Sequence, residues 1–404
     1  MADFDVAISG GGMAGATLAV ALARQGRKIC VIEPVVRDAD HQPSYNDRTL
    51  VLNAASLNIL GNLGLMDGRL QLTPVEEIHV SRQGRAGHVR MRAADHGRQR
   101  FGAVVVAREL GNVLLDALAE SPNIRVLCPD ALTGWQPGPG RVLVRLDSGD
   151  AITARLLVGA DGTGSAVRRL AGIEPRIHDY NQSALVFNAR SEQAHGNRAW
   201  ERFTGHGPVA VLPQPQGRLG VVLIDSRDSI ADLVETSDAQ ILALLHERFG
   251  HRLGAFSEPG QRSSYPLVRL QATTGHAQRM VLIGNAATTV HPVSAQGFNL
   301  GLRDVAGLVE ILEGVGDIGE PGLLEHYNAQ RRADRAETIR YTDTLARAFT
   351  NPSMPFGLGT RLGLAAHAFF PALERRLAAA AMGFRSPVSR LASREWSPGR
   401  RRTS

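Results

Sequence analysis

Three glycines near the start of the chain have the spacing of a phosphate-binding turn. Gly10, Gly12 and Gly15 form a G-x-G-x-x-G pattern between an apolar run, residues 4–8, and an alanine-rich run, residues 14–24. In a strand, tight turn and helix, the first glycine permits the sharp turn, the second lets the backbone approach a pyrophosphate, and the third lets the helix pack on the strand. The free N–H groups of the helix's first turn then face the phosphates.

A carboxylate follows at the distance that a dinucleotide site needs. A second apolar run, residues 28–32, ends at Glu33, about 20 residues beyond the glycines. A carboxylate at that point can accept hydrogen bonds from both hydroxyls of an adenosine ribose. An ordinary βαβ turn would also contain glycines, but here the strand, the helix and the acid all stand in the order of a dinucleotide-binding unit.

Two further stretches place polar residues at the ends of apolar runs. Asp161 and Gly162 follow residues 155–160, and Asn285 follows residues 280–284. The C-terminal ends of parallel strands are where α/β sheets bind ligands, although a generic strand-end turn would give the same pattern at Asp161. We therefore expect both stretches near the ligand.

A loop that begins the next helix completes the candidate site. It contains His291 and Pro292, and the free N–H groups of the helix could stabilise negative charge on a flat ligand. His291 is a candidate catalytic base, with a capping or packing histidine as the alternative. No Ser-His-Asp set, paired carboxylates or metal-ligand cluster stands out in the sequence.

The amino-acid composition limits the classes of protein and of binding partner that the chain fits. The 404 residues are 43% hydrophobic and 21% charged, with a net charge of +6, as in an ordinary globular protein. Lys28 is the only lysine and the arginines are spread along the chain, which argues against nucleic-acid binding and leaves a solvated basic surface or weak attraction to an anionic membrane. No apolar run is long enough to span a bilayer, so we expect a cytoplasmic protein with possible peripheral contact at the bacterial inner membrane. We expect Cys30 and Cys128 to be buried, reduced thiols.

The pattern of apolar residues predicts an α/β fold with a Rossmann-like dinucleotide domain, an inserted β-rich substrate domain and a helical C-terminus. Residues 177–275 read as strands interrupted by one helix over residues 238–249. The expected divisions are a discontinuous dinucleotide domain (1–74, 101–176 and 276–340), the β-rich domain (75–100 and 177–275), C-terminal helices (341–390) and a loose basic tail (391–404).

Taken together, these stretches resemble a known family. Gly10–Gly15 with Glu33, Gly159–Arg168 and Gly284–Asp304 occur in the order found in the flavin-dependent aromatic hydroxylases with the para-hydroxybenzoate hydroxylase fold. Within that family the chain is most similar to the ubiquinone-biosynthesis hydroxylases, above all those that act on 2-polyprenyl-6-methoxyphenol. The residues that carry this closer resemblance lie at 11–18, 201–208, 262–267, 284–287 and 296–301.

The resemblance implies an FAD site and its residues. The glycine turn would hold the pyrophosphate and Glu33 the ribose. Asp161-Gly162 would lie between FAD and the nicotinamide cofactor, and the loop from Pro292 would line the isoalloxazine ring. The implied cofactor-binding residues are Gly10, Gly12, Met13, Ala14, Gly15, Glu33, Arg48, Arg108, Asp161, Gly162, Asn285, Pro292, Gln296, Gly297, Phe298 and Asn299.

Two of these positions depart from the family pattern. Asn285 stands where most relatives have aspartate, and an amide can still bond a ribityl hydroxyl. Ala295 stands where relatives usually have glycine, so a positive φ there would cost about 1–2 kcal/mol.

The resemblance also implies the chemistry. NAD(P)H, visiting transiently because no second glycine motif is present, would reduce FAD, and O2 would form a flavin C4a-hydroperoxide that hydroxylates a lipid-like phenol. The alternatives are the same chemistry at another ring position or on an unrelated phenol, and a non-catalytic flavin-fold protein that binds prenyl chains. Possible partners are a membrane surface, a ubiquinone-biosynthesis complex and a second copy of the chain.

Overall fold

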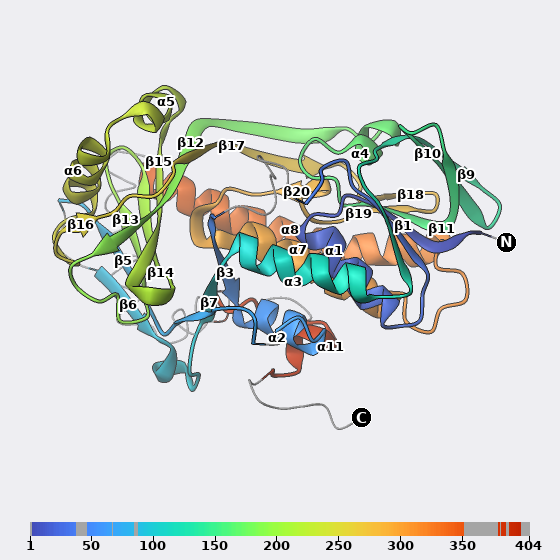
Figure 1. Cartoon of the computed structure of the whole chain (residues 1–404), viewed down its shortest axis with the longest axis horizontal. Coiled ribbons are helices and arrows are strands. Elements are labelled where there is room, and N and C mark those ends of the chain that lie inside the picture. Colours follow the sequence, from blue (N-terminus) through green and yellow to red (C-terminus); the bar gives the residue numbers. More distant parts are fainter. Residues whose placement is uncertain are drawn as a thin grey trace.

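A computed structural model describes residues 2–37, 47–66, 68–84, 88–350, 379, 381–384 and 388–396. Within them the strands form two large sheets at opposite ends of an elongated molecule, with a small third sheet between them (Figure 1). The long strand β12 (Pro175–Ser191) and its partner β17 (Ser263–Ala272) run from one end of the molecule to the other (Figure 1).

The first sheet is built on parallel strands with buried, apolar sequences. β1 pairs with β2 and β11, and β11 pairs with β19, all in parallel, so their C-terminal ends meet at one edge. The strands of this sheet are β1 (Phe4–Ser9), β2 (Ile29–Ile32), β8 (Ile124–Leu127), β9 (Leu132–Gly138), β10 (Arg141–Leu146), β11 (Ala151–Gly159), β18 (His276–Ala277) and β19 (Met280–Leu282). This edge carries Glu33, Asp161 and Asn285 shortly after the ends of their strands.

Helices cover one face of the first sheet and a hairpin covers part of the other. α1 (Met13–Ala23) packs against α3 (Ala107–Glu120) and α7 (Gln296–Ile311), and α8 (Pro321–Thr350) packs on α7. Almost every side chain of α1 is buried, which explains its alanine-rich sequence. On the opposite face the hairpin of β9 and β10 buries Leu132, Val142 and Val144 against the sheet.

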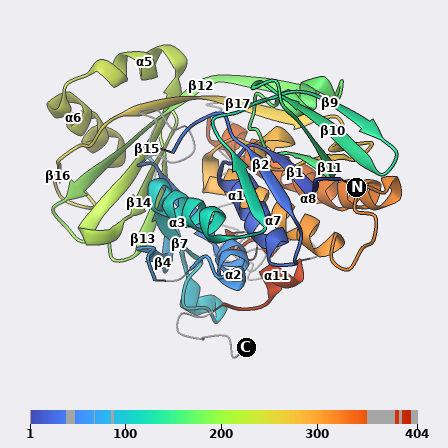
Figure 2. The ribbon, with the colours of Figure 1, turned by 45° about the vertical axis from the view of Figure 1, so that its right-hand side comes forward.

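The second sheet is mainly antiparallel and lies at the other end of the molecule. Its strands, besides β12 and β17, are β5 (Glu77–Arg82), β6 (His88–Arg92), β13 (Arg198–Phe203), β14 (Pro208–Pro213), β15 (Arg218–Ser226), β16 (Phe256–Ser257) and β20 (Thr288–Thr289). Its outer face packs against α5 (Arg227–Glu235) and α6 (Asp238–Phe249) (Figure 2). The sequence analysis predicted α6 but not α5, a short helix in which Ile230 is the one buried side chain.

The third sheet and the remaining short helices connect these parts. The sheet contains β3 (Thr49–Asn53), β7 (Gly102–Val106) and β4 (Thr73–Val75). Asn53 caps α2 (Ala54–Asn62), because its side chain accepts the N–H of Ser56. α4 (Ala166–Leu170) follows the end of β11.

The C-terminal part corrects one expectation. Residues 391–396 do not form a loose tail: α11 (Arg390–Ser393) packs on α2, where Asn62 donates to the carbonyls of Leu391 and Arg394. The N–H of Trp396 also donates to Asn58, so this segment finds partners that its sequence does not show. Residues 397–404, and most of the helices predicted after residue 350, lie outside the described residues, and the domain boundaries stay a prediction.

The two cysteines differ in their exposure to solvent. Cys30 is buried as expected, but Cys128 is exposed because the strand β8 that precedes it lies at the edge of the first sheet. Among the described helices, none combines the length and apolar character needed to cross a bilayer.

Candidate functional site

A cavity of about 1270 Å³ lies between the first and second sheets. Its lining joins the C-terminal edge of the first sheet, the loop before α7 and the inner face of the second sheet. The cofactor-binding residues predicted from the sequence all line this cavity except Gly15, Arg108 and Asn299. Segments that are far apart in sequence are therefore brought to one space.

The glycine turn has the backbone that its sequence predicts. Gly10 has φ +103°, and a Cβ there would lie 2.6 Å from the carbonyl oxygen of Ala160. A Cβ on Gly15 would lie 2.0 Å from the carbonyl oxygen of Gly10, so Gly15 serves helix packing rather than the cavity surface. No side chain caps the start of α1 at Gly12, which leaves the first-turn N–H groups for a ligand.

Glu33 is held against this turn. Its Oε2 accepts the N–H of Gly11 at 2.6 Å and its Oε1 accepts the N–H of Val35 at 2.9 Å. A carboxylate has about four acceptor positions, so both oxygens retain capacity for ribose hydroxyls. The hydrogen bonds orient the side chain before any ligand binds.

Asp161 is similarly fixed beyond the end of β11. Its Oδ2 accepts the N–H groups of Ala166 (2.7 Å) and Val167 (3.1 Å) in the first turn of α4. Its Oδ1 is buried and has no hydrogen-bond partner among the described residues. Because a buried acceptor without a partner is costly, this atom is suited to a ligand group. In the same cavity lining, the hydroxyls of Thr163 and Thr289 form a hydrogen bond of 3.0 Å.

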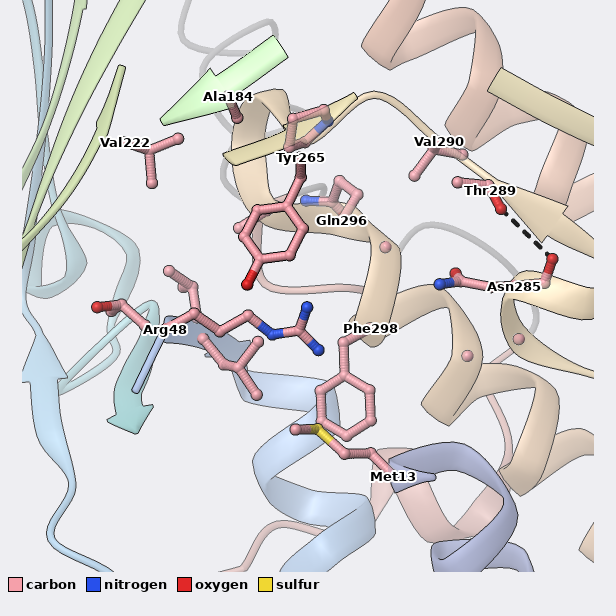
Figure 3. Close-up of a pocket in the computed structure, with 18 of the residues that line it drawn as sticks. Met13, Arg48, Ala184, Val222, Tyr265, Asn285, Thr289, Val290, Gln296 and Phe298 are labelled. Atoms are coloured by element: carbon pink, nitrogen blue, oxygen red, sulfur yellow. Dashed lines mark hydrogen bonds between the residues drawn. The ribbon is translucent and has the colours of Figure 1, made fainter. Parts of the chain in front are cut away.

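The loop before α7 forms the opposite side of this part of the cavity. Ala295 has φ +49° and ψ +40°, the left-handed conformation that its glycine-bearing relatives suggested. No side chain caps α7, and Gln296 and Gly297 of its first turn line the cavity. Figure 3 shows Asn285 and Gln296 directed into the same space from separate elements.

Arg48 lies across from this loop. Its guanidinium stands 5.8 Å from the centre of the Tyr265 ring, a cation–π distance, and Figure 3 shows it between Tyr265 and Phe298. Burial lowers the pKa of Arg48. Met13 from α1 lies against Phe298 at the bottom of the same view (Figure 3).

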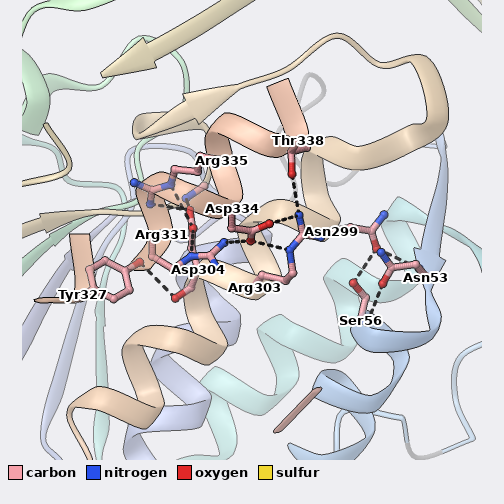
Figure 4. A network of polar contacts seen from close by, with 11 residues as sticks. Asn53, Ser56, Asn299, Arg303, Asp304, Tyr327, Arg331, Asp334, Arg335 and Thr338 are labelled. Carbon is pink, nitrogen blue, oxygen red and sulfur yellow. Dashed lines mark hydrogen bonds and ion pairs between the residues drawn. The ribbon is translucent and has the colours of Figure 1, made fainter. Parts of the chain in front are cut away.

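Asn299 lies behind the loop and not in the cavity lining. It accepts the N–H of Asn53 (3.0 Å) and the hydroxyl of Ser56 (2.6 Å), and it donates to the carbonyls of Val51 and Ala295. These four bonds tie the start of α7 to the start of α2 (Figure 4). Asn299 therefore positions the loop and is not itself exposed to a ligand.

Arg108 and His291 are also placed away from the cavity lining. Arg108, in the first turn of α3, pairs with Asp47 at 3.1 Å on the surface. His291 is buried edge-on against Tyr180, and its Nδ1 accepts the N–H of Val293. Burial lowers the pKa of His291 to about 4, so it is neutral near pH 7, and its contacts favour the packing role.

An ion-pair network supports the site from behind. Asp304 of α7 accepts the N–H of Gly284 at 3.0 Å and pairs with Arg331 (2.8 Å) and Arg335 (2.9 Å) of α8 (Figure 4). Arg303 pairs with Asp334 at 2.8 Å in the same network. It thus joins α7, α8 and the turn that presents Asn285.

Charge compensation is strong in this network. Burial alone would raise the pKa of Asp334, but Arg331 and Arg303 outweigh it and hold the pKa at about 2. The sequence showed these residues only as charges on helices, because their pairing depends on how α7 and α8 pack.

The inner face of the second sheet forms an apolar wall that sequence reasoning had not resolved. Its side chains include Ala184, Val222, Ile224 and Phe203, and one carboxylate, Glu201, lies among them. The signal in the sequence was the alternation of Ala199, Glu201 and Phe203 on one face of β13, but the sequence alone does not say which face borders a cavity.

The fold and site fit one class of protein. The close approach at Gly10, the uncapped starts of α1 and α7 and the free Oδ1 of Asp161 suit an extended dinucleotide with phosphates and hydroxyls. The family model described as "FAD binding domain" matches residues 3–342. The protein is an FAD-dependent monooxygenase.

Comparison with known proteins narrows the class. The chain is 36% identical to ubiquinone hydroxylase UbiL of Rhodospirillum rubrum, over 94% of this chain and 89% of that protein. It is 32% identical to 3-demethoxyubiquinol 3-hydroxylase of Escherichia coli, over 94% and 98%. The chain belongs to the ubiquinone-biosynthesis flavin hydroxylases, and is therefore an enzyme rather than a non-catalytic prenyl-binding protein.

A solved structure shows the same fold at low sequence identity. p-Nitrophenol 4-monooxygenase PnpA of Pseudomonas putida superposes with a TM-score of 0.76 at 18% identity, covering 95% of this chain and 98% of that chain. The fold class predicted from the sequence is confirmed.

Proposed function

We propose that this enzyme hydroxylates the ring of a polyprenylated phenol in ubiquinone biosynthesis, with 2-polyprenyl-6-methoxyphenol as its substrate. The observation that carries the proposal is the continuity of the cavity. The loop residues Gln296 and Gly297 and the apolar wall at Val222 and Ile224 line one and the same cavity. A phenol with a prenyl chain would bury its carbon atoms on this wall while its ring faces the loop.

The residues of the first sheet would hold FAD. Gly10, Gly12 and the start of α1 would bind the pyrophosphate, Glu33 the ribose, and the loop before α7 the ring system. FAD reduced by NAD(P)H supplies the chemistry, in which one atom of O2 is transferred to the phenol ring and the other leaves as water.

The chain's own contribution is position and dryness. Asn299 and the Asp304 network hold the loop and the Asn285 turn in place, so the reacting ring meets a preorganised surface. The apolar wall excludes water from the ring, which favours hydroxylation over wasteful release of peroxide.

Hydroxylation at a different ring position is the second candidate. It is favoured by the Escherichia coli relative, which is named as 3-demethoxyubiquinol 3-hydroxylase. The two candidates differ in the ring carbon that is hydroxylated, and experiment separates them.

Complementation tests both candidates. The gene would be expressed in bacterial strains that each lack one ring hydroxylase of ubiquinone biosynthesis, with the quinone intermediates identified by mass spectrometry. We expect ubiquinone to return in the strain that accumulates 2-polyprenyl-6-methoxyphenol. Rescue only of a strain blocked at another position would select the second candidate, and rescue of none would contradict both.

We also propose that the enzyme contacts the membrane surface where its apolar substrate resides. Residues 397–404 include three consecutive arginines, Arg400, Arg401 and Arg402, which would attract anionic lipids. Deletion of residues 397–404 leaves the packed segment around Trp396 intact and is expected to reduce sedimentation with anionic liposomes. Unchanged sedimentation would argue against this contact.

A further inference from the structure

Glu201 lies in the middle of a cross-strand row of apolar side chains. It is opposite Val80 of β5 and Ala210 of β14, and the row continues to Val89 on one side and Val222 on the other. Directly opposed residues in a sheet point to the same face. All of them line the cavity, so the carboxyl stands on its apolar wall.

This carboxyl is not paired. Within the part of the chain that the structure describes, Glu201 forms no hydrogen bond or ion pair, and burial raises its pKa to about 7. Arg82, the charged residue nearest along this face of β5, is opposite Phe203 and does not line the cavity. Glu77 and His79 of β5 are opposite Arg198 and Trp200 on the other face of the sheet.

The remaining charged and titratable groups are separated from Glu201 by the sheet or by the cavity. β14 contributes none, and the ion pair of Asp225 with Arg248 lies on the helix-covered face. The groups that share the cavity lining are Glu33, Arg48, Asp161, Tyr265 and Tyr341. A carboxyl on an apolar wall without a partner costs stability, which calls for a functional reason.

We propose that Glu201 is the base that accepts the phenolic proton of the substrate. The assignment rests on the proposed function, because a phenol on this wall would have one carboxylate within its apolar surroundings to bond. Hydrogen bonding to Glu201 would fix the orientation of the ring, and therefore the carbon that faces the loop before α7.

The proton balance of the step is complete. The phenol O–H bond breaks and an O–H bond forms on Glu201, leaving an electron-rich phenolate that reacts readily with an electrophilic oxygen atom. When the hydroxylated ring regains aromaticity, its attacked carbon loses a proton, which ends on the oxygen atom that leaves as water, and Glu201 returns its own proton to the phenolic oxygen. A carboxyl that titrates near neutrality suits this exchange better than one with an ordinary pKa, because an unperturbed phenol has a pKa of about 10.

Two variants separate basicity from orientation. Glu201→Gln keeps the length and can still hydrogen-bond but cannot take a proton, whereas Glu201→Leu removes both functions. Glu247→Gln on the exposed side of α6 is the matched control. The probes are 2-geranyl-6-methoxyphenol and its methyl ether, which has no phenolic proton.

The readouts are FAD retention, probe binding, product formation and NAD(P)H consumption over a range of pH. For wild type, hydroxylation should fall as the pH drops below about 7, because Glu201 must be deprotonated. In Glu201→Gln the turnover number for product should fall about 100-fold and this pH limb should disappear, while FAD retention and probe binding persist. In Glu201→Leu binding of the phenol should weaken to that of the methyl ether.

Three outcomes would overturn the assignment. They are an unchanged turnover number and pH profile in Glu201→Gln, equal binding of phenol and methyl ether by wild type, and loss of FAD from Glu201→Gln, which would make the residue structural. Failure of the proposed function is distinct, since it would appear as wild type that retains FAD but converts neither this phenol nor any quinone intermediate.

Discussion

The carboxylates on the two sides of the cavity differ in their hydrogen bonds and ion pairs. On the cofactor side Glu33 and Asp161 accept backbone N–H groups, and Asp304 behind them is paired with two arginines. On the strand side Glu201 stands among valines and alanine and has no partner within the described part of the chain. The first arrangement fixes geometry, because hydrogen bonds and ion pairs hold each acid in one orientation. The second leaves a group free to gain and lose a proton near neutral pH.

The largest effect should come from breaking the paired side. Asp304→Ala would leave Arg335 buried without its ion-pair partner and Arg331 paired with Asp334 alone, and breaking a buried pair typically costs about 3–5 kcal/mol. Urea unfolding followed by circular dichroism measures this loss. Asp116→Ala removes exposed pairs with Arg37 and Arg69 and should cost under about 1 kcal/mol. Similar losses in both variants would show that the network contributes little.

A somewhat smaller effect is expected at the glycine turn. Gly15→Ala places a Cβ 2.0 Å from the Gly10 carbonyl oxygen, so α1 must move away from β1. We expect about 3 kcal/mol of destabilisation and release of FAD on gel filtration, measured from the flavin absorbance. Gly316→Ala, where no atom lies near the added Cβ, is the control and should retain FAD. Full retention by Gly15→Ala would contradict the packing argument.

The unpaired side should show its cost as a pH dependence of stability. The pKa of Glu201 rises on folding from about 4.5 to about 7, so the folded state binds this proton more tightly. The associated stability is present below the lower value and is lost as the pH rises through the higher one. Between about pH 5 and about pH 8, Glu201→Gln should therefore gain about 2 kcal/mol relative to wild type. Thermal unfolding of both proteins across this range measures the gain, and a constant difference would show that the carboxyl is not desolvated.

The smallest effect concerns the loop between the two sides. Ala295 has a positive φ, so Ala295→Gly should relieve strain, partly offset by the greater freedom of glycine in the unfolded chain. The net stabilisation should be about 1 kcal/mol in thermal unfolding. Ala306→Gly, inside the regular part of α7, should have the opposite sign. Destabilisation by both would mean that Ala295 makes contacts that outweigh its strain.

Sequence reasoning succeeded where the site is local or where a side chain follows directly from its strand. Gly10 and Gly12 border the cavity as predicted, and Asp161 and Asn285 do so because parallel strands end at one edge. Arg108 does not line the cavity, because its side chain at the start of α3 turns to a surface partner, Asp47. The fold class was also predictable, because continuous apolar runs indicate buried parallel strands, whereas alternation of apolar and polar residues indicates half-buried antiparallel strands.

The sequence by itself determined the phosphate turn and the acid after the second strand. These features depend on bonds and sterics within a few residues, so residue type is enough to specify them. The tertiary structure alone decided that Glu201 faces the cavity, that His291 lies buried against Tyr180 and that Asp304 meets two arginines of α8. Each of these depends on which faces of distant elements pack together, and that choice is made by burial over the whole chain rather than by any local pattern.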